Sequence, residues 1–438
     1  MDPDLLPPAS APDAAYSVVA GSFRSLSLAL LAFYPLNKTL EHVATVPAFG
    51  PHQYLATTPR KDYVYTTSWA TPPILSSWRT TRTNERVDGL EHVNTVPITA
   101  TSSYINIPPP YTFIYSAGGP TGEVHEYDPQ TGGFGRKVQQ VLFVPEDELE
   151  KADKSRVALR YGSHGVEFSS EGDGFIPVLG TDSIEMYRKD PETGELIHIS
   201  SNGSPRGTGL HDGPRHVKVH PNGKVLYCVA EHTNFVDVYH ILPDKLQPVS
   251  SHSILPRHLS ESDGDVKFDD PHTKSKYRGG TLMLTPSTPE YPAPIALFTT
   301  TRGATSTEKG WLSIFKLDAD GHIIDNESHD ETKGPQSPLS QSVIRFETPT
   351  SSGKANALDI RSKDNSPGVW VLLTDDDKQA DERGAVRVLE WDGWGDELGL
   401  RIVAEWPSSV DSQPEAQPES RAEDPQRFTG ASHAIWLD

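Results

Sequence analysis

Four residues in the middle of the chain carry side chains suited to chemistry on an anion: His164, Arg215, Glu231 and Arg302. The planar guanidinium group of arginine binds carboxylates and phosphates through paired hydrogen bonds. An imidazole or a carboxylate can give or take a proton near neutral pH. If the four side chains converge in the fold, the chain holds the parts of a small acid–base site.

Each of these residues also has a structural interpretation. A histidine at the start of a strand, such as His164, is commonly a hydrogen-bonded structural residue. Glu231 can end a loop or pair with Arg215. Arg278, a further basic candidate, can be a surface residue beside a polar insertion. The residue types alone therefore leave a site and a salt-bridge network open as alternatives.

The other histidines and the acidic runs give no metal-site pattern. The run Asp375–Asp377 follows a predicted strand and is interpreted as a solvated turn rather than a calcium site. No glycine-rich loop precedes a helix, so we expect no phosphate-cradling loop. Four histidines lack the spacing of zinc ligands and are interpreted as structural residues: His52, His216, His220 and His433. The sequence therefore predicts no metal site.

The charge of the chain limits its partners. It has 39 basic and 60 acidic residues and a formal net charge of −21, which repels nucleic acid and anionic membrane surfaces. The same field repels a small anionic substrate, so a site for one must gather arginines locally. The single cysteine, Cys228, allows no internal disulfide and indicates a reducing compartment. We recognise no signal peptide or membrane anchor and expect a cytoplasmic protein.

Short strand-like segments separated by Gly, Pro, Asn and Asp follow one another along the chain, with almost no helical periodicity. They form a loose repeat of four strands. The clearest copy runs from Arg215 to Pro256 and contains the hairpin signal Pro221-Asn-Gly223. Five further copies begin near His52, Ser103, His164, Arg278 and Ala355.

A seventh copy is split between the two ends of the chain. Residues 16–47 supply three strands without a first one, and residues 433–438 match the missing strand. The pattern predicts an all-β, seven-bladed β-propeller whose C-terminal strand closes the ring by pairing into the N-terminal blade. We expect one such domain over residues 16–438, after a disordered tail at 1–15, with exposed polar insertions near 258–277, 326–341 and 408–428.

The predicted propeller gives the four candidate residues a common place. First strands line the central channel of a propeller, and the strand ends form its mouth. His164 and Arg215 open the first strands of adjacent repeats, Glu231 follows a second strand, and Arg302 follows the second strand of the next repeat. We therefore expect the four side chains on one side of the channel mouth.

Four segments carry recognisable motifs: Gly213–Glu231, His164-Gly165, Thr299–Arg302 and His433–Trp436. Together they resemble the fungal 3-carboxy-cis,cis-muconate cyclases, members of a seven-bladed lactonase superfamily that also contains a bacterial 6-phosphogluconolactonase. The resemblance covers essentially the whole chain from about residue 16 and is strongest between 160 and 305.

The resemblance implies a cofactor-independent cycloisomerase that closes 3-carboxy-cis,cis-muconate to 3-carboxymuconolactone in the protocatechuate branch of the β-ketoadipate pathway. One carboxylate adds to a conjugated alkene, charge builds up as an enolate, and the α-carbon takes a proton. The family pattern implies that Arg215 and Arg302 hold the carboxylates, and that His164 and Glu231 are the candidates for proton transfer. The sequence does not say which of the two is the acid.

The segment Gly353-Lys-Ala-Asn-Ala357 departs from the family's His-Ser-Asn-Ala opening, because it keeps the asparagine and lacks the histidine. Lys354 can supply a cation there instead. We therefore expect Arg278, Lys354 and Asn356 to bind the substrate together with the two arginines. Two other functions stay open: lactone hydrolysis of the 6-phosphogluconolactonase type, and a non-catalytic propeller whose loops bind a protein. Assembly into a homo-oligomer stays open as well.

Overall fold

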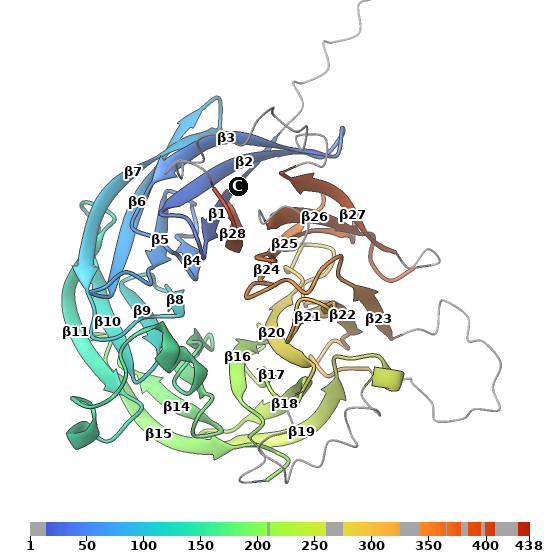
Figure 1. Cartoon of the computed structure of the whole chain (residues 1–438). Coiled ribbons are helices and arrows are strands. Elements are labelled where there is room, and N and C mark those ends of the chain that lie inside the picture. The colour runs from blue at the N-terminus through green and yellow to red at the C-terminus, as the bar shows by residue number, and fades with distance from the viewer. Residues whose placement is uncertain are drawn as a thin grey trace, which may run out of the picture.

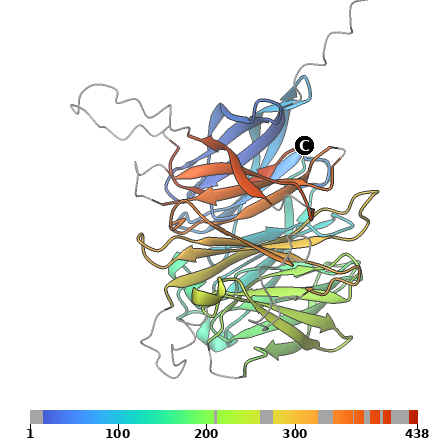
Figure 2. The same cartoon turned by 90° about the vertical axis from the view of Figure 1, so that its right-hand side faces the viewer.

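The alternation of short apolar segments and turns produces seven antiparallel sheets of four strands each in the computed structural model. The sheets are arranged around a central axis as the blades of a propeller (Figure 1), and Figure 2 views the same ring from its edge. The structure describes residues 15–207, 211–259, 275–324, 342–364, 366–377, 384–395, 399–407 and 428–438. The predicted all-β, seven-bladed fold is confirmed.

Six blades are each built from four consecutive strands. From the axis outward, the first three are β4 (Leu55–Thr57), β5 (Tyr63–Thr67), β6 (Ile74–Thr83) and β7 (Arg86–Pro97); β8 (Tyr104–Asn106), β9 (Phe113–Gly118), β10 (Thr121–Tyr127) and β11 (Phe134–Leu142); and β12 (Glu167–Phe168), β13 (Asp173–Val178), β14 (Ser183–Lys189) and β15 (Leu196–Gly203). The next three are β16 (Pro214–Val219), β17 (Val225–Ala230), β18 (Phe235–Ile241) and β19 (Leu246–Ser253); β20 (Tyr277–Leu284), β21 (Ala296–Gly303), β22 (Trp311–Lys316) and β23 (Val343–Glu347); and β24 (Leu358–Ser362), β25 (Val369–Asp375), β26 (Ala385–Trp391) and β27 (Leu400–Trp406). Two 3₁₀-helices, η1 (Glu146–Glu148) and η2 (Arg156–Arg160), lie between β11 and β12.

The seventh blade joins the two ends of the chain. Its innermost strand is β28 (Ala431–Trp436), followed outward by β1 (Tyr16–Ser22), β2 (Ser27–Tyr34) and β3 (Thr39–Pro47). β28 pairs antiparallel with β1, and Val19 faces Ile435 at the centre of the ladder. The C-terminal strand thus closes the ring as predicted, beside β1 in Figure 1.

The middle strands are buried because each blade packs on a neighbour at both faces. In β17, Val225 and Tyr227 belong to one apolar cluster with Phe315 of the following blade. The alternate residues Leu226 and Cys228 belong to another cluster with residues of the preceding blade. Since successive strand residues point to opposite faces, a strand buried on both faces is apolar throughout.

Three of the seven inner strands, β4, β8 and β12, contain two or three residues each. β12 contains only Glu167–Phe168, so His164 precedes this strand and does not open it as predicted. Arg302 is the second-to-last residue of β21 and does not follow this strand as predicted. The observed strand bounds differ from the predicted ones by only a few residues. His164 and Arg302 therefore stay at the predicted ends of their strands.

Most of the predicted insertions, and the predicted tail, lie outside the described residues: 1–14, 260–274, 325–341 and 408–427. The last residues of two predicted insertions belong to the blades. Tyr277 begins β20, and Phe428 packs against Trp406 with ring centroids 5.5 Å apart. None of the helices in the described ranges is long and apolar enough to cross a lipid bilayer.

Candidate active site

A carboxylate held between two arginines lies at one end of the central channel. Glu231 directly follows β17, Arg215 is the second residue of β16, and Arg302 comes from β21 of the next blade. Arg215 Nε donates a hydrogen bond to Glu231 Oε2 at 3.1 Å, and Arg302 Nη2 donates to Glu231 Oε1 at 3.2 Å. The structure therefore brings three of the four predicted residues into direct contact.

The two arginines determine the protonation state of Glu231. Burial alone would raise the pKa of this carboxyl group, but Arg302 and Arg215 favour the ionised form and bring the pKa to about 2. Burial lowers the pKa of Arg215 to about 10, which leaves it charged at neutral pH. Glu231 is therefore a carboxylate between two cations and carries no proton to donate.

His164 is the buried, neutral member of the group. Burial and the nearby charge of Arg215 lower its pKa to about 3. Its ring lies 5.4 Å from that of His216, measured between centroids. Its Nδ1 atom is buried and makes no hydrogen bond within the described part of the chain. At neutral pH His164 therefore offers a ring nitrogen whose partner the protein does not supply.

A small cavity lies in the channel beside Arg215. Residues from six blades line it, most of them at the start of an inner strand: Phe23, Gln53, Tyr54, Ser103, Arg215, His216, Thr281, Lys354, Ala355, Asn356, Ala357 and Ser432. Two predicted substrate-binding residues, Lys354 and Asn356, thus share a cavity with Arg215. His164, Glu231 and Arg302 are adjacent to it through Arg215.

His216 is also at the site, although it was interpreted only as a structural residue. Consecutive strand residues normally point to opposite faces, but the β16–β17 register shifts between Pro214 and His216. This bulge brings the side chains of Arg215 and His216 together, with Arg215 Nη1 donating to His216 Nε2 at 3.3 Å. The other ring nitrogen, Nδ1, lies 3.0 Å from Thr281 Oγ1. His216 therefore orients the guanidinium group of Arg215.

The other three histidines that were interpreted as structural make backbone contacts that fit this role. His52 Nδ1 lies 3.0 Å from the carbonyl oxygen of Thr67, and His433 Nδ1 accepts a hydrogen bond from Leu55 N at 3.2 Å. His220 Nδ1 accepts from the backbone of the following turn at 3.3 Å.

The run Asp375–Asp377 is buried, and its interpretation as a solvated turn is wrong. The three residues are 1%, 4% and 8% exposed. Asp375 Oδ2 accepts a hydrogen bond from Arg387 Nη1 at 2.5 Å, and Asp376 Oδ1 accepts from Arg24 Nε at 2.8 Å. Arg387 of β26 and Arg24 of the β1–β2 connection thus compensate for the burial of Asp375 and Asp376.

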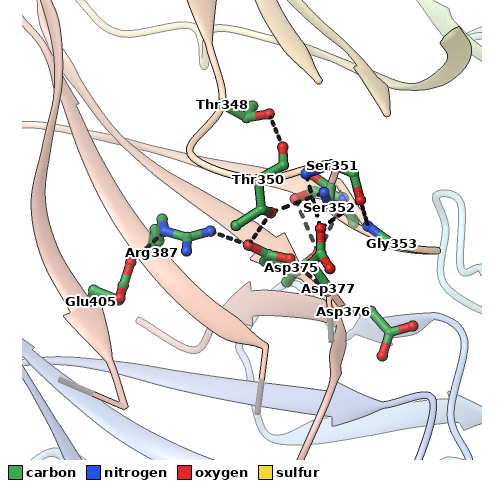
Figure 3. Close-up of polar contacts among 12 residues, drawn as sticks. Thr348, Thr350, Ser351, Ser352, Gly353, Asp375, Asp376, Asp377, Arg387 and Glu405 are labelled. Atoms are coloured by element: carbon green, nitrogen blue, oxygen red, sulfur yellow. Dashed lines mark hydrogen bonds and ion pairs between the residues drawn. The ribbon is translucent and has the colours of Figure 1, made fainter. Parts of the chain in front are cut away.

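The aspartates hold the loop that precedes β24 (Figure 3). Asp377 Oδ2 accepts from Ser351 N at 3.0 Å and from Ser351 Oγ at 2.5 Å, and Asp375 Oδ2 accepts from Thr350 Oγ1 at 2.7 Å. The same loop offers the carbonyl oxygen of Gly353 to Arg302 Nη1 at 3.4 Å. The aspartates therefore position a loop that supports Arg302 and places Lys354 and Asn356 at the cavity.

Additional positive charge lies near the ion pairs that Glu231 forms with Arg215 and Arg302. Arg278 lies directly opposite Arg302 in the β20–β21 ladder. Burial lowers the pKa of Arg302, Glu231 opposes this shift, and the nearby charges of Arg278 and Arg160 add to it. No carboxylate in the described ranges forms an ion pair with Arg278 or Arg160. This end of the channel therefore has more cations than carboxylates, as an anion site in an acidic chain requires.

Several residues of this region were not predicted from the sequence, and Arg160, Ser432 and His216 show why. Arg160 belongs to η2, a short 3₁₀-helix in a connection that carried no recognisable pattern. Ser432 precedes the His433–Trp436 motif, and no feature of the sequence distinguishes it from other serines. The role of His216 depends on a bulge, for which its position beside Arg215 was the only available signal.

Comparisons with known proteins agree with this architecture. The family model for the seven-bladed β-propeller lactonases matches residues 18–270. A Cutaneotrichosporon cutaneum protein named muconate cycloisomerase 1 is 28% identical over 408 residues, which are 91% of this chain and 96% of that protein. A 6-phosphogluconolactonase of Erwinia tasmaniensis is 33% identical over 88 residues, 20% of this chain and 26% of that protein.

A solved structure extends the likeness to the whole fold. The periplasmic gluconolactonase of Pseudomonas aeruginosa superposes with a TM-score of 0.66 at 15% identity, covering 97% of this chain and 99% of that one. The family model alone spans more than half of the present chain. The protein therefore belongs to the seven-bladed β-propeller lactonase family.

Proposed function

We propose that the protein is a cofactor-independent cycloisomerase that closes 3-carboxy-cis,cis-muconate to 3-carboxymuconolactone. The observation that carries the proposal is the pair Arg215 and Arg302 around Glu231, with surplus positive charge beside it in a chain of net charge −21. The similarity to a muconate cycloisomerase over nearly the full length supports the same reaction class.

The reaction balances with one proton and no other reactant. A carboxylate oxygen of the trianionic substrate attacks an alkene carbon, and a C–O bond forms. The displaced π electrons move to the α-carbon and its carboxylate as an enolate, which then takes a proton at carbon. Arg215 and Arg302 bind the carboxylates and stabilise the enolate charge as it develops. The product is a dianion, so each turnover takes up one proton.

The pKa values favour His164 over Glu231 as the proton donor. Glu231 has a pKa of about 2 because two arginines hold it, which makes it a carboxylate throughout the working range. His164 is neutral in the free protein because burial and the charge of Arg215 lower its pKa, and the three negative charges of a bound substrate act in the opposite direction and raise it. We therefore assign the proton to His164, and to Glu231 the orientation of the two arginines.

Lactone hydrolysis is the second candidate. The matching segment of the 6-phosphogluconolactonase and the fold of the gluconolactonase favour it. The same arginines would bind a phosphate or carboxylate, and His164 would activate water. A non-catalytic propeller is the weaker alternative, because Arg215 and Glu231 point toward each other and their pKa values are strongly shifted.

The sign of the proton change separates cyclisation from hydrolysis. In an unbuffered pH-stat, cyclisation of 3-carboxy-cis,cis-muconate consumes acid, with one proton taken up per molecule closed. Hydrolysis of 6-phosphogluconolactone consumes base, because it releases a proton. Acid consumption with the first substrate, above the rate without protein, supports the cycloisomerase. Base consumption with the second substrate and none with the first would replace it by the hydrolase.

A further inference from the structure

Two neutral polar groups in the cavity beside Arg215 have no partner. Ser432 is 2% exposed and Asn356 is 3% exposed. Ser432 Oγ and Asn356 Nδ2 are buried, and neither forms a hydrogen bond within the described ranges of the chain. Buried polar groups are nearly always paired, so each unpaired one needs an explanation. Both residues line the cavity that also contains Arg215 and Lys354.

The two unpaired groups come from segments far apart in sequence. Ser432 belongs to β28, the closing strand, whereas Asn356 precedes β24 in the adjacent blade. Thr374 Oγ1 lies 3.0 Å from the carbonyl oxygen of Ser432 and accepts a hydrogen bond from Ala357 N at 3.1 Å. One threonine hydroxyl therefore fixes the backbone beside both unpaired groups.

Asn356 is held in a backbone conformation that asparagine rarely adopts. Its φ is 147°, and its carbonyl oxygen accepts from Thr300 Oγ1 at 2.9 Å. Gly280 leaves the space for its side chain, because a Cβ atom there would lie 2.2 Å from Asn356 Oδ1. Strained residues of this kind persist where the surrounding structure imposes them, and they gather at ligand sites. The strained backbone here holds the unpaired amide of a residue that lines the cavity.

We propose that Ser432 Oγ and Asn356 Nδ2 form a neutral two-donor subsite for the substrate carboxylate that takes no part in ring closure. The inference rests on the proposed function and deepens it. The arginines take the carboxylates whose charge changes during the reaction, and uncharged donors suffice for one whose charge is constant. The subsite then gives the protein its preference for a tricarboxylate over a dicarboxylate of the same length.

Replacing Ser432 by alanine tests the subsite, because a role in binding changes KM whereas a structural role changes the melting temperature. We expect S432A to raise KM for 3-carboxy-cis,cis-muconate roughly 10-fold with little change in kcat, since one hydrogen bond to a carboxylate is lost. The melting temperature should not fall, because the deleted hydroxyl has no partner among the residues that the structure describes. A purely structural serine would give the opposite result, a lower melting temperature with KM unchanged.

Ser116 supplies a matched control. It is a buried serine in β9, 4% exposed, whose Oγ is likewise unpaired but which does not line the cavity. S116A should leave KM and kcat unchanged. If S116A and S432A raise KM equally, the effect is not local to the cavity and the subsite is rejected.

Calorimetry separates failure of the subsite from failure of the proposed function. Propane-1,2,3-tricarboxylate and glutarate share a five-atom dicarboxylate frame, and only the former carries a third carboxylate. We expect S432A to weaken binding of the tricarboxylate roughly 10-fold and to leave glutarate unchanged. That result in a protein without cyclase activity would sink the proposed function and keep the subsite. Active protein with equal tricarboxylate affinity in both forms would sink the subsite alone, and absence of binding and activity would sink both.

Discussion

The ring of His433 stacks on that of Tyr54 with centroids 3.9 Å apart and planes inclined by 24°. This contact joins the C-terminal strand to the residue just before β4. Tyr54 in turn stacks on Tyr104 of the next blade at 4.0 Å. Since Tyr54 and Ser432 both line the cavity, the strand that closes the ring also completes the candidate active site.

Removal of residues 433–438 should therefore unfold the protein. The deletion breaks the β1–β28 ladder and takes away three large buried apolar side chains, Ile435, Trp436 and Leu437. Each contributes roughly 2 kcal/mol, and their sum approaches the whole stability of an ordinary domain. Thermal melting followed by circular dichroism measures this directly. A truncated protein that melts like the full chain would show that the ring holds without its closing strand.

Replacing Arg302 by alanine should lower kcat for carboxymuconate by a factor of about 10² or more, because the residue stabilises the developing enolate. Arg302→Lys should recover only part of the loss, since an ammonium group cannot reproduce the fork that contacts Glu231 and Gly353. Arg136→Ala is the control, because this exposed arginine only pairs with Glu126 at the surface. Steady-state rates of the three variants decide the point, and an unchanged rate in R302A would remove Arg302 from the mechanism.

Replacing His164 by glutamine should lower kcat by a factor of about 10² to 10⁴ with little change in melting temperature. In the wild type, kcat should fall as the pH rises, because the imidazole must carry a proton when substrate is bound. H164Q should lose this limb of the pH profile. If the pH dependence of kcat is the same in both proteins, the proton comes from another group.

The buried neutral histidines predict a loss of stability in mild acid. The pKa values of His52 and His125 are about 4 and those of His164 and His433 about 3, in each case first because of burial. These values lie below that of an unfolded histidine, near 6.5, so the unfolded state binds more protons. The stabilisation is complete above pH 6.5 and is lost as the pH falls toward 4 and 3.

Urea denaturation at a series of pH values measures this loss. Below pH 6.5 each such histidine should contribute a slope of about 1.4 kcal/mol per pH unit to the free energy of unfolding. His125 lies in β10 and does not line the cavity, so His125→Gln should reduce the slope by that amount without affecting the site. A free energy of unfolding that stays constant between pH 6.5 and 5 would mean that these histidines are accessible to protons in the folded protein.

The propeller ring could be predicted from the sequence more fully than the candidate active site. The missing first strand before Tyr16 and the motif at His433–Trp436 were enough to predict the closure, because strand pairing follows from repeat order. The contact of Arg215, Glu231 and Arg302 followed from equivalent positions in adjacent repeats. Features that depend on contacts between dissimilar segments could not be predicted in this way.

The run Asp375–Asp377 illustrates the limit. Its residue types are typical of a solvated turn, and contacts with Arg387, Arg24 and the hydroxyl groups before β24 make its burial favourable. Ser432 and Asn356 show the same dependence, because whether a polar group finds a hydrogen-bond partner among the described residues is a property of the folded channel.

The ultraviolet absorbance of 3-carboxy-cis,cis-muconate with purified protein, in EDTA and without added cofactor, tests the proposed cyclisation itself. We expect loss of the conjugated-diene absorbance with wild-type protein, and a rate lower by a factor of about 10² or more with the Arg302→Ala and His164→Gln proteins. An absorbance that does not change with wild-type protein would rule out the proposed cycloisomerase.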